Sequence, residues 1–392
     1  MCFTFDTSFI YYFMKAKLFL IIGVVLLCLS CEDSSQKIND NIYKVDLDSK
    51  IDPFGVIFSK AELIPIETDD SCLVGYPQKV YPSQNKFYLY DFWLQNLLVF
   101  EQSGKYLDRV GKKGQGPNEY LGMFDCYVDT VEQRAYFLSV FGHIKCFDFN
   151  SQLVDDIVLP ARPHYYSMAL MDNNKYMVTW SCLEPTDGGG VLILNKETND
   201  TIRSDWYDDR MFDNQEQFPF HKYGDRLFFA TGIRQQVYEV TLDGLLPVYL
   251  WDFGKNNIKE STLDYYLSLE NPTERNNTII DDIGTERLSF CMHRQNQNKK
   301  YSYVALQRKA GMRPPLTHVF YDKEKQKSLV FDNISDVCPM SYPLYFGDDY
   351  ILTDIFFDER EKWKSILPAS EYQKLEQMKE DDNPCLLKLY FK

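Results

Sequence analysis

Strand-length runs of apolar and aromatic residues recur along the chain from about residue 79. The clearest unit lies at residues 86–110, where the runs KFYLYD, NLLVF and KYLDRV alternate with short polar spacers. Runs of this length between turn residues are typical of an antiparallel meander of strands. The same succession returns at residues 134–159 and 225–251. The pattern therefore predicts repeated units of antiparallel strands.

Three more degenerate units bring the number to six, with starts near residues 79, 124, 164, 220, 286 and 343. Intervals of about 40 to 66 residues suit four-stranded propeller blades with insertions in the later units. We therefore predict an all-β fold, a six-bladed β-propeller of four-stranded antiparallel blades. Residues 61–66 precede the first unit and form a strand that is left over. In a closed ring such a strand pairs with the last blade and removes its open edge.

Two stretches depart from the strand pattern. Residues 261–269 begin with a capping-box spacing, from Ser261 to Asp264, and predict a short helix inserted between units four and five. Residues 370–378 have apolar positions at helical spacing and predict a C-terminal helix that packs on the last blade. Residues 385–391 then predict a final strand in the sixth blade.

The first 31 residues differ from all that follows. Lys15 and Lys17 precede an apolar run at residues 18–29, which is too short to span a bilayer. The order of basic, apolar and small residues is that of a secretory signal, although a short membrane anchor is an alternative interpretation. The sequence thus divides into a signal peptide (1–30), a tether (31–42) and a propeller (43–392).

Cys31, directly after this run, resembles the cysteine of a bacterial lipobox, which becomes the acylated N-terminus. Cys28 departs from that pattern, which usually has Leu at this position. Glu32 and Asp33 resemble the acidic export tag of surface lipoproteins in some Gram-negative anaerobes. The resemblance implies lipidation of Cys31, which anchors an outer-membrane lipoprotein to the membrane on its periplasmic or outer face.

The charge of the chain excludes one class of partner. Its formal net charge is −15, and loss of residues 1–30, which carry two Lys and one Asp, makes this −16. A body this acidic repels phosphate backbones, so we expect no nucleic-acid partner.

Seven cysteines remain after Cys31, and none has Cys-x-x-Cys or Cys/His metal spacing. We expect them to be mostly buried thiols.

Residues 111–120, GKKGQGPNEY, match a G-x-x-G-x-G-P-x-E-Y signature. This stretch resembles that of the six-bladed β-propeller lipoproteins related to NHL-repeat proteins, and residues 91–93, 98–100 and 383–384 look like the same family. The resemblance implies the propeller fold and an envelope or cell-surface location. It implies no catalytic residues, because members of that family are largely uncharacterised.

The glycines of this signature suggest a shaped loop. Glycine permits positive φ and close backbone approach, and proline fixes the exit of the loop. A phosphate cradle is the alternative, but no helix is predicted to follow and the spacing fits neither a P-loop nor a dinucleotide fingerprint. We therefore predict a structural connector between blades, in which the last two residues pack or hydrogen-bond across blades. Its residues are Gly111, Gly114, Gly116, Pro117, Glu119 and Tyr120.

Asp91, Trp93 and Arg109 lie near the ends of strands predicted for the first blade. Aromatic and charged side chains at such positions can stack on and hydrogen-bond a sugar or peptide. We therefore name them as candidate ligand-binding residues, with packing between blades as the alternative.

None of the five histidines has a second histidine at i+4, so local spacing predicts no metal site and no cofactor. Related propeller lyases and lactonases use His or carboxylates around the central channel with Ca²⁺ or Zn²⁺. A metal-dependent hydrolase or lyase is therefore the alternative function. The first hypothesis is a non-enzymatic binding or assembly module for a glycan, a peptide or an envelope protein. The sequence identifies no catalytic residues.

Overall fold

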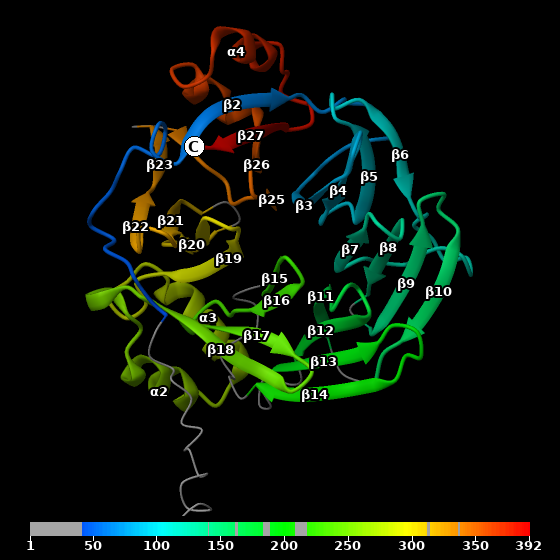
Figure 1. Cartoon of the computed structure of the whole chain (residues 1–392), viewed down its shortest axis with the longest axis horizontal. Helices are drawn as coiled ribbons and strands as arrows, with labels where there is room; N and C mark the ends of the chain where they lie inside the picture. Colours follow the sequence, from blue (N-terminus) through cyan, green and yellow to red (C-terminus); the bar gives the residue numbers. More distant parts are fainter. Residues whose placement is uncertain are drawn as a thin grey trace, which may run out of the picture. The chain divides into compact units, whose positions relative to one another are not determined.

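The computed structural model describes residues 41–139, 141–160, 164–182, 189–207, 218–311, 314–335 and 338–392. Residues Ile42–Lys392 form one compact unit. Within it, six antiparallel sheets follow one another around a ring (Figure 1). The predicted six-bladed β-propeller is thus confirmed. Among the described residues, no helix is long and apolar enough to cross a membrane.

The first three blades are regular four-stranded sheets. Blade 1 contains β3 (Pro77–Pro82), β4 (Lys86–Asp91), β5 (Asn96–Glu101) and β6 (Tyr106–Val110). Blade 2 contains β7 (Asp125–Asp129), β8 (Arg134–Leu138), β9 (His143–Asp148) and β10 (Leu153–Val158). Blade 3 contains β11 (Tyr165–Met171), β12 (Tyr176–Cys182), β13 (Gly189–Asn195) and β14 (Thr201–Tyr207).

The last three blades carry the insertions. Blade 4 contains β15 (Phe220–Tyr223), β16 (Arg226–Phe229), β17 (Gln236–Thr241) and β18 (Gly244–Asp252). Blade 5 contains β19 (Cys291–Gln297), β20 (Tyr301–Gln307), β21 (Leu316–Asp322) and β22 (Lys327–Phe331). Blade 6 contains β25 (Tyr345–Phe346), β26 (Tyr350–Ile355), β27 (Cys385–Phe391) and β2 (Phe58–Ile64). A small hairpin, β23 (Asn333–Ser335) and β24 (Cys338–Pro339), links the fifth and sixth blades.

The first strand of each unit lies nearest the axis of the ring, and the last strand lies outermost (Figure 1). The six innermost strands are β3, β7, β11, β15, β19 and β25. Their side chains therefore surround the central channel. The predicted starts of the units lie within about five residues of the observed starts of these strands, because each innermost strand opens a new run of the repeat.

The ring closes through the strand that was left over in the sequence pattern. β2 pairs antiparallel with β27, with Ala61 opposite Leu389 and Leu63 opposite Leu387. The outermost strand of blade 6 therefore comes from the N-terminal side of the propeller, as predicted, although it begins three residues earlier at Phe58. Closure removes the open edge that β27 would otherwise present to solvent.

A second N-terminal strand is not apparent from the sequence. β1 (Ile42–Lys44) pairs parallel with β18 and gives blade 4 a fifth strand. Its Tyr43 ring stacks on Tyr249 and Tyr321, with ring centroids 4.5 and 4.0 Å apart. The chain before β2 therefore runs along the outside of blades 4 and 5. A three-residue strand is too short to give a periodic signal, so its side-chain pattern could not reveal it.

Both predicted helices are present. α2 (Glu260–Ser268) lies between blades 4 and 5, but its N-cap is Lys259 and no side chain caps it, so the proposed capping box is wrong. α4 (Ala369–Glu376) packs on blade 6, where Glu371 accepts a hydrogen bond from the Leu63 backbone at 2.8 Å. The structure adds α3 (Pro272–Asp282), η1 (Gly254–Asn256) and η2 (Phe357–Trp363). The sequence analysis did not predict α3, although Asn271 before Pro272 is a helix-start signal, and the Asn271 side chain accepts a hydrogen bond from Glu274 N–H at 3.1 Å.

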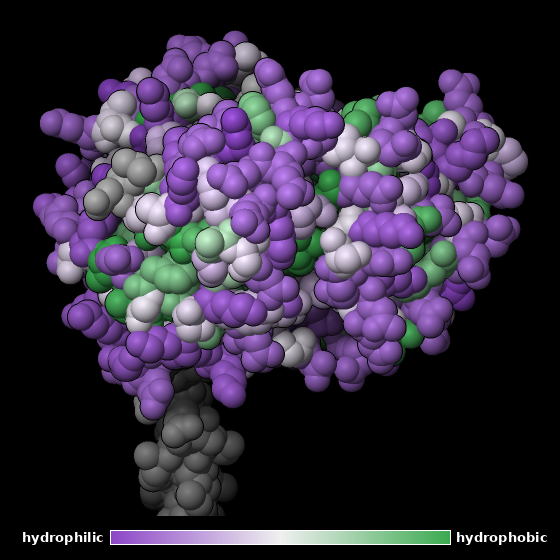
Figure 2. Space-filling model, turned by 90° about the horizontal axis from the view of Figure 1, so that it is seen from above, coloured by the Kyte–Doolittle hydropathy of each residue, from purple (hydrophilic) through white to green (hydrophobic). Residues whose placement is uncertain are grey.

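Six cysteines of the described part are buried and none of them is in a disulfide, as expected. They are Cys72, Cys126, Cys146, Cys291, Cys338 and Cys385. Outside this interior, Figure 2 shows a face on which hydrophilic residues dominate and apolar residues form small groups.

Candidate functional site: the mouth of the central channel

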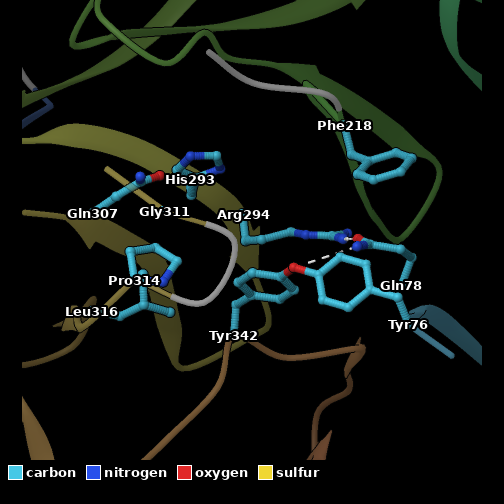
Figure 3. Close-up of a pocket in the computed structure, with 10 residues that line it drawn as sticks. All are labelled: Tyr76, Gln78, Phe218, His293, Arg294, Gln307, Gly311, Pro314, Leu316 and Tyr342. Atoms are coloured by element: carbon cyan, nitrogen blue, oxygen red, sulfur yellow. Dashed lines mark hydrogen bonds between the residues drawn. The ribbon is translucent and has the colours of Figure 1, made fainter. Parts of the chain in front are cut away.

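A cavity of about 130 Å³ lies at one end of the channel (Figure 3). We call it the channel mouth and define it by Tyr76, Gln78, Phe218, Arg294 and Tyr342, which are among its lining residues. Tyr76, Phe218 and Tyr342 each lie just before an innermost strand, whereas Gln78 lies near the beginning of β3 and Arg294 in the middle of β19. Four blades therefore contribute side chains to the same small space.

Arg294 is the central group of the channel mouth. Its guanidinium lies over the rings of Phe218 and Tyr342, 4.4 and 4.7 Å from their centroids. It donates a hydrogen bond to the Gln78 side-chain oxygen, and the Tyr76 and Tyr342 hydroxyls lie 2.7 Å apart (Figure 3). A cation between aromatic rings in a desolvated site is held by roughly 2 kcal/mol or more. Arg294, at 8% exposure, is therefore firmly positioned.

The backbone at Arg294 is unusual. Its φ is +47°, and it lies where the register of β19 shifts against β20, between His293 and Asn296. Such backbone conformations cost roughly 1–3 kcal/mol in a non-glycine residue and cluster at ligand sites. A bulge re-aims a side chain relative to a regular strand. The irregularity in β19 is what directs Arg294 toward the channel mouth.

Deeper in the channel, a second cavity of about 240 Å³ shares Phe218 and Arg294 with the mouth. Lys79 also lies over the Phe218 ring, at 4.6 Å, and forms an ion pair with the buried Asp125. Asp125 in turn accepts hydrogen bonds from the Ser167 hydroxyl and the Met168 N–H, both at 2.9 Å. This contact joins blades 1, 2 and 3 at the axis, because β7 presents the carboxylate to both neighbours.

The axis of this acidic protein is basic. Besides Arg294 and Lys79, two partly buried lysines lie by the innermost strands: Lys222 is on β15, and Lys323, which follows β21, donates to Gln297 of β19. Burial lowers the pKa of Lys222, and burial together with the Arg226 charge lowers that of Lys323 to about 8. A channel lined mainly by one sign of charge concentrates the electrostatic field within it. The interior therefore favours ligands of opposite charge to its lining.

The structure does not bring the three predicted ligand-binding residues together. Asp91 is fully buried, and its carboxylate accepts hydrogen bonds from the backbone N–H groups of Gly75, Tyr76 and Leu94. Burial raises the pKa of the Asp91 carboxyl, and these hydrogen bonds oppose that shift. Asp91 thus fixes the backbone of Tyr76 at the channel mouth and does not itself face solvent.

Trp93 and Arg109 lie in different places. The Trp93 side chain is 56% exposed and stacks on Tyr76, with ring centroids 5.4 Å apart, so it extends the mouth outward. Arg109 lies on the outermost strand of blade 1 and donates a hydrogen bond to the Ser71 backbone oxygen. Of the three candidates, only Trp93 presents an exposed side chain beside the channel mouth.

The residues that define the mouth were missed because no local motif unites them. Tyr76, Phe218, Arg294 and Tyr342 are separated by 48 residues or more along the chain. One signal was present: residues 293–298, HRQNQN, form an unusually polar run for the innermost strand of a blade. Such a run at the axis indicates a polar site, since innermost strands otherwise pack between their neighbours.

The glycine-rich loop connects β6 to β7, as the predicted connector should. A Cβ on Gly114 would lie 2.0 Å from the Glu119 carboxylate, which accepts a hydrogen bond from Gly116 N–H at 2.9 Å. The Tyr120 hydroxyl donates to the Gln95 carbonyl at 2.9 Å, and its ring packs edge-on against Phe137. The loop therefore folds on its own carboxylate and anchors between blades 1 and 2.

The other positions of the signature serve the same loop geometry. Gly111 has φ +72°, and a Cβ there would lie 2.9 Å from the Phe137 ring. The Pro117 carbonyl accepts a hydrogen bond from the Lys145 amine at 3.3 Å. The loop also walls a cavity of about 600 Å³, beside which Phe141 is 86% exposed. The carboxylate inside the loop is opposite in charge to what a phosphate cradle requires.

Within the described ranges, no three His, Cys, Asp or Glu side chains are grouped as metal ligands. His221 and His293 each line one of the channel cavities. His318 is buried between blades, where its ring nitrogens contact the Tyr303 hydroxyl at 2.8 Å and the Met340 carbonyl at 2.9 Å. Burial lowers the pKa of His318 to about 4, so this histidine is neutral near pH 7.

Comparison with solved structures supports the fold. The structure of a "putative exported protein" from Bacteroides fragilis is 15% identical, with a TM-score of 0.71, and the match covers 90% of this chain and 99% of that chain. Hydrazine synthase from Kuenenia stuttgartiensis is 10% identical over 83% of this chain and 87% of that one, and its TM-score of 0.42 is too low to indicate the same fold.

No curated protein matches the sequence. A family model described as "Domain of unknown function (DUF4934)" matches residues 43–390, which is nearly the whole propeller from β1 to β27. The match thus includes the closing strand and every blade. This chain belongs to the DUF4934 family.

Proposed function

We propose that this protein is an exported binding module that holds its ligand at the channel mouth and does not transform it. The ligand is a glycan, a peptide or a segment of a partner envelope protein. The observation that carries the proposal is the Arg294 guanidinium, fixed between Phe218 and Tyr342 inside a strongly acidic protein.

Three features of the mouth suit binding. A guanidinium held by flanking rings loses little conformational freedom when it pairs with a ligand, so less affinity is lost to ordering. Tyr76 and Trp93 offer stacked aromatic surface at the edge of the cavity. The strained backbone of Arg294 is maintained by its surroundings, which is typical of preorganised sites.

A metal-dependent hydrolase or lyase is the alternative function. It requires at least two or three His or carboxylate side chains that converge on the axis. In the described part of the channel, the carboxylate of Asp125 is instead engaged by Lys79, Ser167 and Met168. The geometry of these residues therefore supports binding better than it supports catalysis.

Replacing Arg294 with Lys is expected to weaken ligand binding by about tenfold or more, because Lys keeps the charge but lacks the planar fork and the stacking surface. The measurement is binding of the purified protein to an array of saccharides and peptides. Arg109→Lys is the matched control, since Arg109 lies on the outermost strand, and it should bind as the unmodified protein does. Equal binding by both variants, or release of a cleaved product, would contradict the proposal.

We also propose that the protein is anchored through a lipid on Cys31 in the outer membrane and is related to NHL-type propeller lipoproteins. Residues 1–40 lie outside the described residues, so the support comes from the signal pattern of the sequence. The Bacteroides fragilis relative of similar fold, whose name calls it exported, agrees with an extracytoplasmic location.

Cys31→Ala is expected to move the protein from the membrane fraction to the soluble fraction, because a removed acyl chain takes with it about 0.8 kcal/mol of membrane affinity per buried CH₂. Fractionation followed by immunoblotting measures this. Cys28→Ala, three residues earlier, should leave the protein in the membrane fraction. If Cys31→Ala fractionates as the unmodified protein does, acylation is not the anchor.

A further inference from the structure

We infer that the inner cavity of the channel, which is lined by residues from all six blades, is a binding site for a carboxylate group. The inference rests on the proposed function and names the chemistry of the ligand. The lining residues Lys79, Gln295 and Pro343 each follow a residue of the mouth along the chain, so the cavity lies directly beneath the mouth. A ligand held at the mouth can therefore extend a group into it.

Two polar atoms beside this cavity lack hydrogen-bond partners. They are Nδ1 of His221 on β15 and Nε2 of Gln295 on β19, whose side chains are 5% and 8% exposed. Both residues line the inner cavity. Buried polar groups almost always form hydrogen bonds, so two such atoms without hydrogen bonds in one cavity indicate that a hydrogen-bonding ligand is missing. The cavity of about 240 Å³ far exceeds the roughly 10–15 Å³ that one water needs.

Both unpaired atoms are hydrogen-bond donors. The Oε1 atom of Gln295 accepts from the Trp251 indole N–H at 2.9 Å, which leaves its Nε2 as the unpaired amide nitrogen. The side-chain oxygen of Gln297 accepts from the Lys323 amine at 3.0 Å. Its amide nitrogen therefore faces His221 Nε2, at 3.4 Å, and Nε2 acts as the acceptor. The single ring proton of a neutral His221 then lies on Nδ1.

The environment keeps His221 in this neutral form. Burial, together with the charge of Lys323, lowers the pKa of His221 to about 3. Its ring also stacks on Phe228, with centroids 5.2 Å apart, which fixes the plane of the imidazole. The Nδ1–H group is therefore an oriented neutral donor throughout the physiological pH range.

Two cations complete the site. Arg294 and Lys79 line the same cavity and both lie over the ring of Phe218. An ionised carboxylate is an acceptor without donors, and its two oxygens can each take more than one hydrogen bond. Donors at His221 and Gln295 with positive charge nearby match that chemistry, whereas a neutral hydroxyl would leave the charges less well compensated. The carboxylate could come from an acidic sugar or from an acidic amino acid.

The test is isothermal titration of the purified protein with two matched pairs, D-glucuronate against D-glucose and L-glutamate against L-glutamine. At least one carboxylate is expected to bind about tenfold or more tightly than its neutral partner, and the pair that discriminates identifies the source. Inorganic phosphate should bind more weakly than that carboxylate. Equal binding within both pairs, tighter binding of phosphate, or no binding of any carboxylate up to about 10 mM would overturn the inference.

Gln295→Glu replaces the unpaired donor by an acceptor and keeps an oxygen for Trp251, so it should weaken carboxylate binding by about tenfold or more. Gln295→Met also removes the donor but adds no charge, and it should likewise weaken carboxylate binding. It replaces Gln295→Glu in the test if that variant fails to fold. The matched control is Thr231→Val, which removes another unpaired buried polar atom that is not in the cavity lining, and its affinity should not change.

The outcomes separate the two proposals. One outcome is that Arg294→Lys loses binding to the saccharide and peptide array, while each carboxylate and its neutral counterpart bind the protein equally. The mouth is then a binding site, but the inner cavity does not select carboxylates. If a carboxylate binds and responds to Gln295→Glu, yet Arg294→Lys leaves array binding intact, the inner site stands and the mouth is not where the larger ligand binds.

Discussion

Deleting residues 43–67 is expected to abolish cooperative folding of the propeller. The deletion removes β2 and with it the buried side chains of Ile57, Phe58, Leu63, Ile64 and Ile66. Burial of each such side chain contributes roughly 1.5–3 kcal/mol, so their sum of about 8–15 kcal/mol is comparable to the entire stability of a typical domain. It also exposes the edge of β27, which then offers unpaired backbone groups to other chains.

Urea unfolding followed by circular dichroism measures this prediction, and light scattering detects association through the freed edge. The matched control deletes only residues 43–50, which removes most of β1 and leaves β2 in place. That shorter deletion should retain a cooperative transition at a lower urea midpoint, since it loses the buried Val45 and Leu47, the stacked Tyr43 and two exposed ion pairs. If the longer deletion leaves an unfolding transition as cooperative as that of the full-length protein, closure of the ring depends on other contacts.

Gly104→Ala is expected to destabilise the fold by about 2–5 kcal/mol, because it combines steric overlap with an unfavourable backbone conformation. Gly104 has φ +90°, and a Cβ there would lie 1.9 Å from the Pro65 backbone oxygen. Its carbonyl accepts a hydrogen bond from Glu67 N–H at 2.9 Å. The substitution would therefore push the hairpin of blade 1 away from the segment that follows the closing strand.

Gly55→Ala is the control for this substitution. Gly55 has a similar φ of +80°, but no atom lies within 4 Å of its added Cβ. It should cost only the conformational penalty of roughly 1–2 kcal/mol. Chemical denaturation of both variants gives the difference in the free energy of unfolding. If the two variants lose equal stability, the contact between Gly104 and Pro65 does not hold blade 1 against the closing strand.

The blades could be predicted because each is encoded locally. Runs such as residues 86–91 and 96–100 carry their own strand length and turn residues, so the repeat is visible without tertiary information. The closing strand at residues 58–64 was found by a topological argument, since one strand was left over and one edge needed a partner. β1 was missed because it is too short for a periodic signal, whereas α3 was missed although Asn271 before Pro272 is a helix-start signal.

The site could be predicted only in part. The glycine-rich loop was identified as a connector because its positions are contiguous in sequence. Arg294, Phe218 and Tyr342 meet only because the ring brings blades 4, 5 and 6 to one axis, and no spacing rule relates them. The Trp93 ring is exposed beside the channel mouth, whereas Arg109 lies on the outermost strand of its blade. Convergence across blades is a property of the fold, not of a motif.

The measurement that tests the central claim most directly is a crystal structure of the protein with the tightest-binding member of the saccharide and peptide array. We predict the ligand, chemically intact, at the channel mouth between Phe218 and Tyr342, with a polar group paired to Arg294. A ligand bound elsewhere on the propeller, or one cleaved in the crystal, would contradict the claim that this channel mouth is a non-catalytic binding site.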